Sequence, residues 1–169
     1  YRSLFGNCTN LESAPTEFPA TTLTDGCYRY MFAKTKVANA PSTLPATTLV
    51  ANCYNAMYRE TRITTAPVLS ASMLVTDCYY AMFSGCTSLT YVKCLATTNI
   101  TVATTNNMFA GISTVGTFER ASGADWPCNA QIPSTWTITP AYTPLYRWET
   151  STDATDYCCD TTTYTKYYK

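Results

Sequence analysis

The chain contains no histidine, and only 13% of its residues are charged, about half of the roughly 25% that soluble domains usually carry. Lys and Arg together number 11, as do Asp and Glu, so the formal net charge is zero. The missing histidine excludes every mechanism that needs an imidazole base and most catalytic zinc sites. The balanced charge argues against a nucleic acid partner, because binding to phosphates requires a dense basic surface.

Several other signals are missing. No run of about 18 apolar residues is present, so we expect no insertion into a membrane. The nine cysteines include no C-x-x-C pair, which is the usual spacing of zinc sites. G-x-S-x-G, G-x-G-x-x-G and P-loop motifs are also absent, and a cysteine nucleophile would lack its usual histidine base. We therefore expect a protein that is not an enzyme and that holds no cofactor and no metal.

What the chain does contain is a repeat of 25 or 26 residues. The segment "FPATTLTDGCYRYMF" at Phe18–Phe32 returns as "LPATTLVANCYNAMY" at Leu44–Tyr58, with eight identical residues in the same slots. Such self-similarity at a fixed period is the sequence signature of repeat architectures. The copies occupy, in order, residues 1–26, 27–52, 53–77, 78–103 and, in decaying form, 104–118.

Two columns of the repeat hold sulfur-containing side chains. A column that recurs in every copy of a stacked repeat faces the interior, where a free cysteine packs as a small apolar side chain and methionine fills gaps. We interpret both columns as inert parts of the core; disulfide formation or partial oxidation is the alternative for the cysteines. The columns are Cys27, Cys53 and Cys78, and Met31, Met57, Met82 and Met108.

Each copy has an internal order of elements. The "CYxxMF" segment, as at Cys27–Phe32, places apolar residues at i, i+4 and i+5, which predicts a short helix. Asn52 and Asp77 stand directly before it, where a helix cap is expected. "LxxAP" predicts a short strand that ends at proline, and "PATTL" predicts a turn into the next copy. Because such short elements cannot bury a face alone, the copies must stack, which predicts an α/β solenoid of the leucine-rich-repeat type.

The full pattern, "LxxAPxLPATTLxxxCYxxMFxGCTSL", resembles the BspA-like, or Treponema-type, leucine-rich repeat. "MFSGCTSL" at Met82–Leu89 matches the second part of that motif closely, and Cys8 and Cys86 sit at its cysteine position. The second and third copies depart from the motif, with Thr35 and Thr61 near that position. The resemblance implies a non-enzymatic surface protein of a gut bacterium or of a phage, whose usual work is adhesion and recognition.

The remainder of the chain breaks the period. Residues 119–141 contain "GADWP" and "IPSTWTI", which combine turn residues with tryptophans, and we interpret them as a cap that closes the open end of the repeat region at 1–118. Residues 142–169 are rich in Thr and Tyr and predict a small β module or a linker. We expect the chain to be a piece of a longer polypeptide.

Positions that vary between copies are the candidates for ligand contact. One variable column lies on the predicted strands, and Lys93 stands where the other copies keep proline. Leucine-rich solenoids often bind their ligands on this sheet. Two arginines belong to a mildly basic patch near the short "CYxxMF" segments, for which a solvated face is the simpler interpretation. The candidate residues are Asn39, Thr65, Tyr91 and Lys93 on the strand side, and Arg59 and Arg62 in the patch.

These features favour an extracellular recognition or adhesion module at a bacterial cell surface or on a virion, as in a phage tail fibre. Its expected partner is a host-surface glycan or a host protein. A homo-oligomer is a further expectation, and it would be a trimer if the chain belongs to a phage fibre. The alternative is a structural spacer or a decoration domain, which would bind only its own virion or cell-surface assembly.

Overall fold

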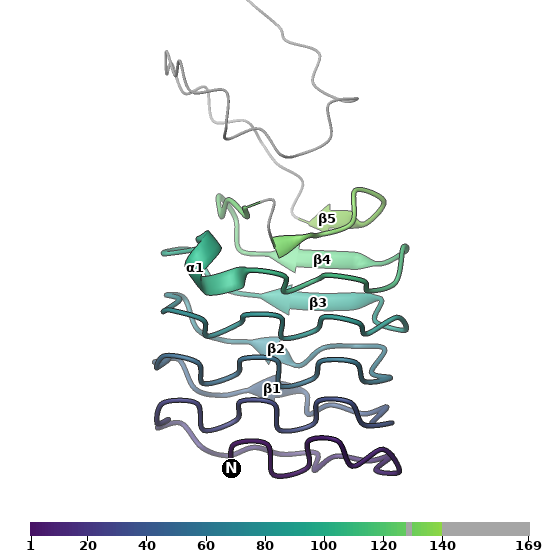
Figure 1. Ribbon diagram of the computed structural model, residues 1–169. Coiled ribbons are helices and arrows are strands. Elements are labelled where there is room, and N and C mark those ends of the chain that lie inside the picture. The colour runs from purple at the N-terminus through teal and green to yellow at the C-terminus, as the bar shows by residue number, and fades with distance from the viewer. Residues whose placement is uncertain (128–129, 140–169) are drawn as a thin grey trace, which may run out of the picture.

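Stacked chain segments joined by a parallel sheet make up the computed structural model, which describes residues 1–127 and 130–139 (Figure 1). The five strands lie in the sheet in their chain order, and all pairs are parallel. The described residues contain one α-helix, α1 (Val102–Thr105). The strands are β1 (Thr43–Leu44), β2 (Val68–Leu69), β3 (Tyr91–Cys94), β4 (Thr117–Arg120) and β5 (Thr137–Thr139).

The strands of the second and third copies begin later than the "LxxAP" pattern predicts. That pattern ends at Pro41 and Pro67, whereas β1 and β2 start beyond these prolines. Proline has no N–H group to donate to a ladder, so regular pairing starts after it. Val68 N, for example, donates to Ser42 O at 3.0 Å. The fourth copy carries Lys93 in the proline position, and β3 accordingly runs through it.

The "CYxxMF" segments, which we predicted as short helices, are instead consecutive turns, so that prediction was wrong. Within the second copy, Met31 N donates to Tyr28 O at 3.2 Å, which closes a turn over three residues. The intervening N–H groups point along the stack: Tyr28 N donates to Cys53 O and Tyr30 N to Asn55 O, both at 2.9 Å. The same alternation recurs in later copies. We call these stacked segments, residues 24–34, 50–60 and 75–85 together with residues 106–111 after α1, the turn ladder (Figure 1).

A left-handed residue at every fourth position explains why the turn ladder is not helical. The φ angle is 58° at Gly26, 55° at Tyr30 and 60° at Lys34. Residue i+2 of a type II turn requires such an angle, whereas a right-handed helix cannot contain it. Asn52 and Asp77, which we predicted as helix caps, share the left-handed column of Gly26. Asn and Asp adopt this conformation more readily than most residues, which accounts for their presence there.

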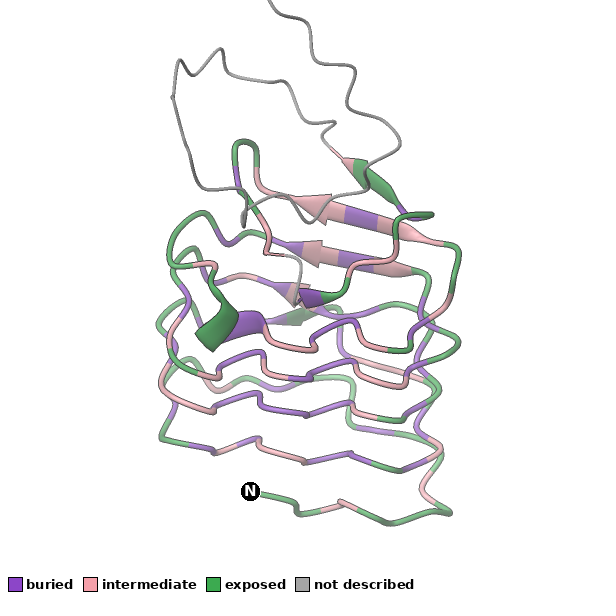
Figure 2. Ribbon diagram, turned by 45° about the horizontal axis from the view of Figure 1, so that its top comes forward, coloured by how far each residue is buried: buried purple, intermediate pink, exposed green. Residues whose placement is uncertain are grey.

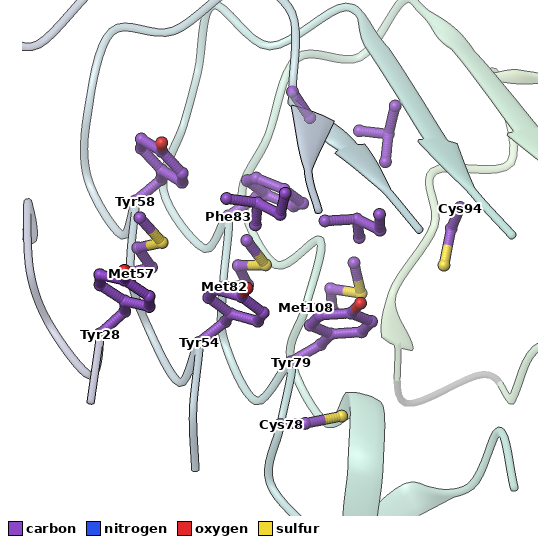
Figure 3. Close-up of a cluster of buried hydrophobic side chains, with 14 of the residues drawn as sticks. Tyr28, Tyr54, Met57, Tyr58, Cys78, Tyr79, Met82, Phe83, Cys94 and Met108 are labelled. Carbon is purple, nitrogen blue, oxygen red and sulfur yellow. The ribbon is translucent and has the colours of Figure 1, made fainter. Parts of the chain in front are cut away.

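One hydrophobic core lies between the sheet and the turn ladder (Figure 2). Two columns of stacked rings run through it, and Figure 3 shows part of both, with methionines between them. Neighbouring centroids are 5.6 to 6.3 Å apart, within the range of favourable offset stacking. The columns are Tyr1, Tyr28, Tyr54 and Tyr79, and Phe5, Phe32, Tyr58, Phe83 and Phe109.

The sulfur-containing columns lie in or beside this core. All four methionines are buried, whereas the cysteine column is graded: Cys53 and Cys78 are buried and Cys27 is half-buried. The buried residues of these two columns are Met31, Met57, Met82, Met108, Cys53 and Cys78.

The sheet continues through the predicted boundary between residues 118 and 119. Phe118 and Glu119 both belong to β4, which pairs with β3 on one side and with β5 on the other. In the predicted cap, the buried Trp136 lies 6.3 Å from the ring of Phe109 and donates its indole N–H to Ser113 O at 2.8 Å. The cap residues up to 139 therefore extend the sheet and cover the end of the core. The predicted β segment at 142–169 lies outside the described residues.

Replacing Lys34 distinguishes the turn ladder from the predicted helix. Lys34 is exposed and left-handed, a conformation that costs a residue with a Cβ about 1–2 kcal/mol, against about 0.5–1 kcal/mol of extra chain entropy for glycine. We expect Lys34→Gly to be more stable than Lys34→Ala by about 0.5–1 kcal/mol in urea unfolding. In a helix, Lys34→Ala would instead be the more stable variant by about 1 kcal/mol, and that result would contradict the turns.

Tyr58 offers a second test, because it is the tyrosine in the column of phenylalanines. It is fully buried, and its hydroxyl has no hydrogen-bond partner among the described residues. Tyr58→Phe removes an unsatisfied polar group, so we expect it to raise the free energy of unfolding by about 1 kcal/mol. Tyr58→Ala, the control that removes the ring, should lower it by about 3–5 kcal/mol. A loss of stability in the phenylalanine variant would mean that the hydroxyl has a partner after all.

Candidate ligand-binding groove

An open groove of about 400 Å³ lies on the outer face of the sheet, where the first three strands begin. Three consecutive copies supply its walls: the second before β1, the third at the start of β2 and the fourth at the start of β3. No lining residue carries a formal charge. The lining consists of Ala38, Asn39, Ala40, Pro41, Ser42, Thr64, Thr65, Ala66, Val68 and Tyr91.

Asn39 is held in place by the copy that precedes it. Its side-chain oxygen accepts a hydrogen bond from Ala14 N at 2.9 Å, and its side-chain nitrogen donates to Ala14 O at 2.8 Å. The amide thus replaces a pair of backbone groups between two copies. Because a primary amide has two N–H donors and two acceptor lone pairs, one donor and one acceptor remain beyond these bonds.

Thr65 and Tyr91 are neighbours across the sheet. A parallel bridge joins them, and Ala66 N donates to Tyr91 O at 2.9 Å. The side chain of Thr65 is exposed, whereas Tyr91 is half-buried and closes one end of the groove. Sequence variation placed three of our candidates in one column, and the structure brings these three, Asn39, Thr65 and Tyr91, to one groove.

Beside the groove, Glu119 joins two of the candidate residues. The Tyr91 hydroxyl donates to Glu119 Oε2 at 2.5 Å, and Lys93 Nζ lies 2.5 Å from Glu119 Oε1. The parallel register explains the meeting, because Lys93 on β3 is paired with Glu119 on β4. We did not predict Glu119 from the sequence. Glu119 stands 26 residues after Lys93, so the repeat period places the two residues in the same column. We missed this signal because we predicted that the repeat region ends at residue 118.

The charges of this cluster cancel locally. The hydrogen bond with Lys93, and next the one from Tyr91, lower the pKa of the Glu119 carboxyl, so it stays ionised to lower pH than usual. The hydrogen bond to Glu119 raises the pKa of both Lys93 and Tyr91, which keeps the ammonium charged and the phenol protonated. The side chains of Lys93 and Glu119 are 33% and 36% exposed. An ion pair at the surface adds little stability, but this one leaves Lys93 already matched with a counter-charge.

Arg59 and Arg62 do not line the groove. Arg59 belongs to the turn ladder and pairs with its neighbour Glu60, with Arg59 Nε 3.0 Å from Glu60 Oε1 and both side chains 42% exposed. Arg62 is exposed, and its backbone N–H donates to Val37 O at 2.9 Å. The predicted candidates therefore divide into a group on the sheet and two arginines away from the groove.

The described cysteines are free thiols. Burial raises the pKa of the Cys53 and Cys78 thiols to about 12, far above the value of about 8.5 for an exposed cysteine. Thiolates, which react and bind metals, are therefore suppressed. Unfolded thiols ionise above pH of about 8.5, so the folded state loses stability as the pH rises from there towards 12. In residues 1–127 and 130–139, no three His, Cys, Asp or Glu side chains are grouped closely enough to hold a metal ion.

Comparisons with known proteins give no relative: no protein-family model, no curated protein and no solved structure matches this chain. In the part of the chain that the structure describes, no helix has the length and apolar character to cross a membrane. The candidate site is consequently judged by its own geometry.

Burial predicts the order in which the thiols react. Among the described cysteines, with iodoacetamide at pH 8, we expect the exposed Cys8 to be alkylated first and the half-buried Cys27 more slowly. The buried Cys53, Cys78 and Cys94 should react only after urea is added, because they are inaccessible and protonated. Peptide mapping by mass spectrometry assigns each site. Rapid alkylation of the three buried thiols in the native state would contradict this placement in the core.

Proposed function

We propose that this chain is a leucine-rich-repeat solenoid of the BspA-like kind and that it acts as an extracellular recognition module. Its support is the spacing of the backbone contacts, in which residues 24 to 26 apart bond along the turn ladder and residues 25 or 26 apart pair along the sheet. In this proposal the protein belongs to a bacterial surface or a phage fibre, is not an enzyme, and binds a host glycan or a host protein.

The observation that carries the recognition role is the position of the variable residues. Asn39, Thr65 and Tyr91 differ from copy to copy while the core columns beside them repeat, and the three line the same groove. The meeting of these three residues in one groove, more than their variation, supports a role in binding. Uncharged polar groups and an aromatic ring around a concave site are typical of ligand binding.

A structural role as a spacer or decoration domain is the second candidate, and the continuous hydrogen bonding of each copy to the next along the turn ladder favours it. In that case the partner is part of the protein's own assembly, and the groove is unoccupied by any host molecule.

Blocking the groove separates the two roles. We expect the fluorescently labelled 169-residue chain to be retained on intact epithelial cells or on intact gut bacterial cells. Thr65→Arg introduces a long charged side chain at an exposed groove position and should reduce the retained protein at least tenfold. Thr21→Arg, the matched control, changes an exposed threonine outside the groove and should leave retention unchanged.

Unaltered thermal unfolding of both variants, measured by circular dichroism, would show that they remain folded. Equal retention of Thr65→Arg and the parent chain would remove the groove from the function. No retention of the parent on either cell type, together with self-association in sedimentation experiments, would favour the structural role.

A further inference from the structure

We propose that the groove binds an uncharged saccharide, with the ring of Tyr91 as the platform for one sugar ring. This inference rests on the proposed recognition function and narrows its ligand to one chemical class.

The electrostatics of the groove favour a neutral ligand. None of its lining residues carries a formal charge. Lys93, the cation beside Tyr91, is 2.5 Å from Glu119 Oε1 and has its positive charge matched there. A sulfated, phosphorylated or carboxylated ligand would find no cation among the residues that line the groove, whereas an uncharged ligand needs none.

The chemistry of the lining matches the two sides of a sugar ring. Ala40, Pro41 and Val68 supply apolar surface, while Ser42 and Thr65 supply hydroxyl groups that can donate or accept. A pyranose likewise has faces of C–H groups and a rim of hydroxyls. The anchored amide of Asn39 adds one donor and one acceptor in a fixed position, because two of its four hydrogen-bonding sites are already used by Ala14.

Tyr91 is the residue that makes the groove suited to sugar. Its hydroxyl is bound to Glu119, so the ring is held from the side that faces away from Thr65 and the groove. An aromatic ring offers a negative face to the weakly positive C–H groups of a sugar. A ring that is already oriented loses little conformational entropy when a ligand stacks on it. We therefore assign the platform to the Tyr91 ring and a positioning role to Glu119.

The size of the groove separates a saccharide from a protein partner. Its volume of about 400 Å³ falls within the range of roughly 300–1,000 Å³ found for small-ligand sites. A stable protein interface needs about 800 Å² on each partner, which would extend well beyond the groove. Binding of a protein over a wider area of the sheet is thus the competing outcome of the test.

The test uses isothermal titration of the full 169-residue chain with defined oligosaccharides. The neutral probes are cellohexaose, maltohexaose and chitohexaose, and the acidic probes are hexagalacturonate and a sulfated heparin hexasaccharide. We expect at least one neutral probe to bind and both acidic probes to bind at least tenfold more weakly. Tyr91→Leu should weaken the neutral probe at least tenfold, whereas Tyr91→Phe, which keeps the ring and loses only its anchor to Glu119, should weaken it about two- to fivefold.

One control variant and one substitute variant complete this experiment. Tyr80→Ala changes a half-buried tyrosine outside the groove and should leave the affinity unchanged. If Tyr91→Leu is unfolded by circular dichroism, Thr65→Arg serves in its place, because Thr65 is exposed and lines the same groove.

The outcomes also distinguish the inference from the proposed function. Preference for the acidic probes, or equal affinity of Tyr91→Leu and the parent, overturns the saccharide platform. If the parent is retained on cells and Thr65→Arg is not, yet no neutral probe binds, recognition stands and the saccharide inference fails. In that case a protein partner is indicated.

Discussion

The hydrogen bonds between residues 24 to 26 positions apart are the constraint on which this structure depends. In the turn ladder, alternate N–H groups close local turns, and the others reach the next copy, as from Tyr54 N to Cys78 O at 3.2 Å. The same spacing on the opposite side pairs the strands, as between Tyr91 and Thr117. With both sides in one register, equivalent side chains lie above one another, and ring stacks, core and groove follow from that alignment.

This register also explains which substitutions the repeat tolerates. Thr61 Oγ1 donates to Tyr58 O at 2.8 Å, and the thiol of Cys86 in the next copy donates to the same carbonyl at 2.9 Å. Thr35 makes the equivalent bond to Phe32 O at 2.8 Å. Where this position is buried, it accommodates either group: the hydroxyls of Thr35 and Thr61 bond within their own copy, and the thiol of Cys86 bonds to the preceding copy.

Several features of the fold could be predicted from the sequence, but the helices could not. The apolar residues of "CYxxMF" are correctly assigned to the core, since Cys53, Met57 and Tyr58 are all buried. An apolar spacing of four and five residues fits a helix, and it fits equally a chain of turns with a left-handed residue at every fourth position. Residues such as Ala56, with φ of 50°, give no local sign of that conformation. Contacts with the next copy decide it.

The sequence likewise predicted part of the candidate groove and missed another part. Sequence variation alone selected the column of Asn39, Thr65 and Tyr91, because these residues differ between otherwise similar copies. Sequence variation did not select Glu119, which lies beyond the predicted end of the repeat region and meets Tyr91 because β4 pairs with β3. The sequence by itself determined the period, the apolar columns and the variable column, since these are written in the order of residues. Only the tertiary structure decided that the period is built from turns and that a carboxylate holds Tyr91, because both depend on contacts between residues far apart in the chain.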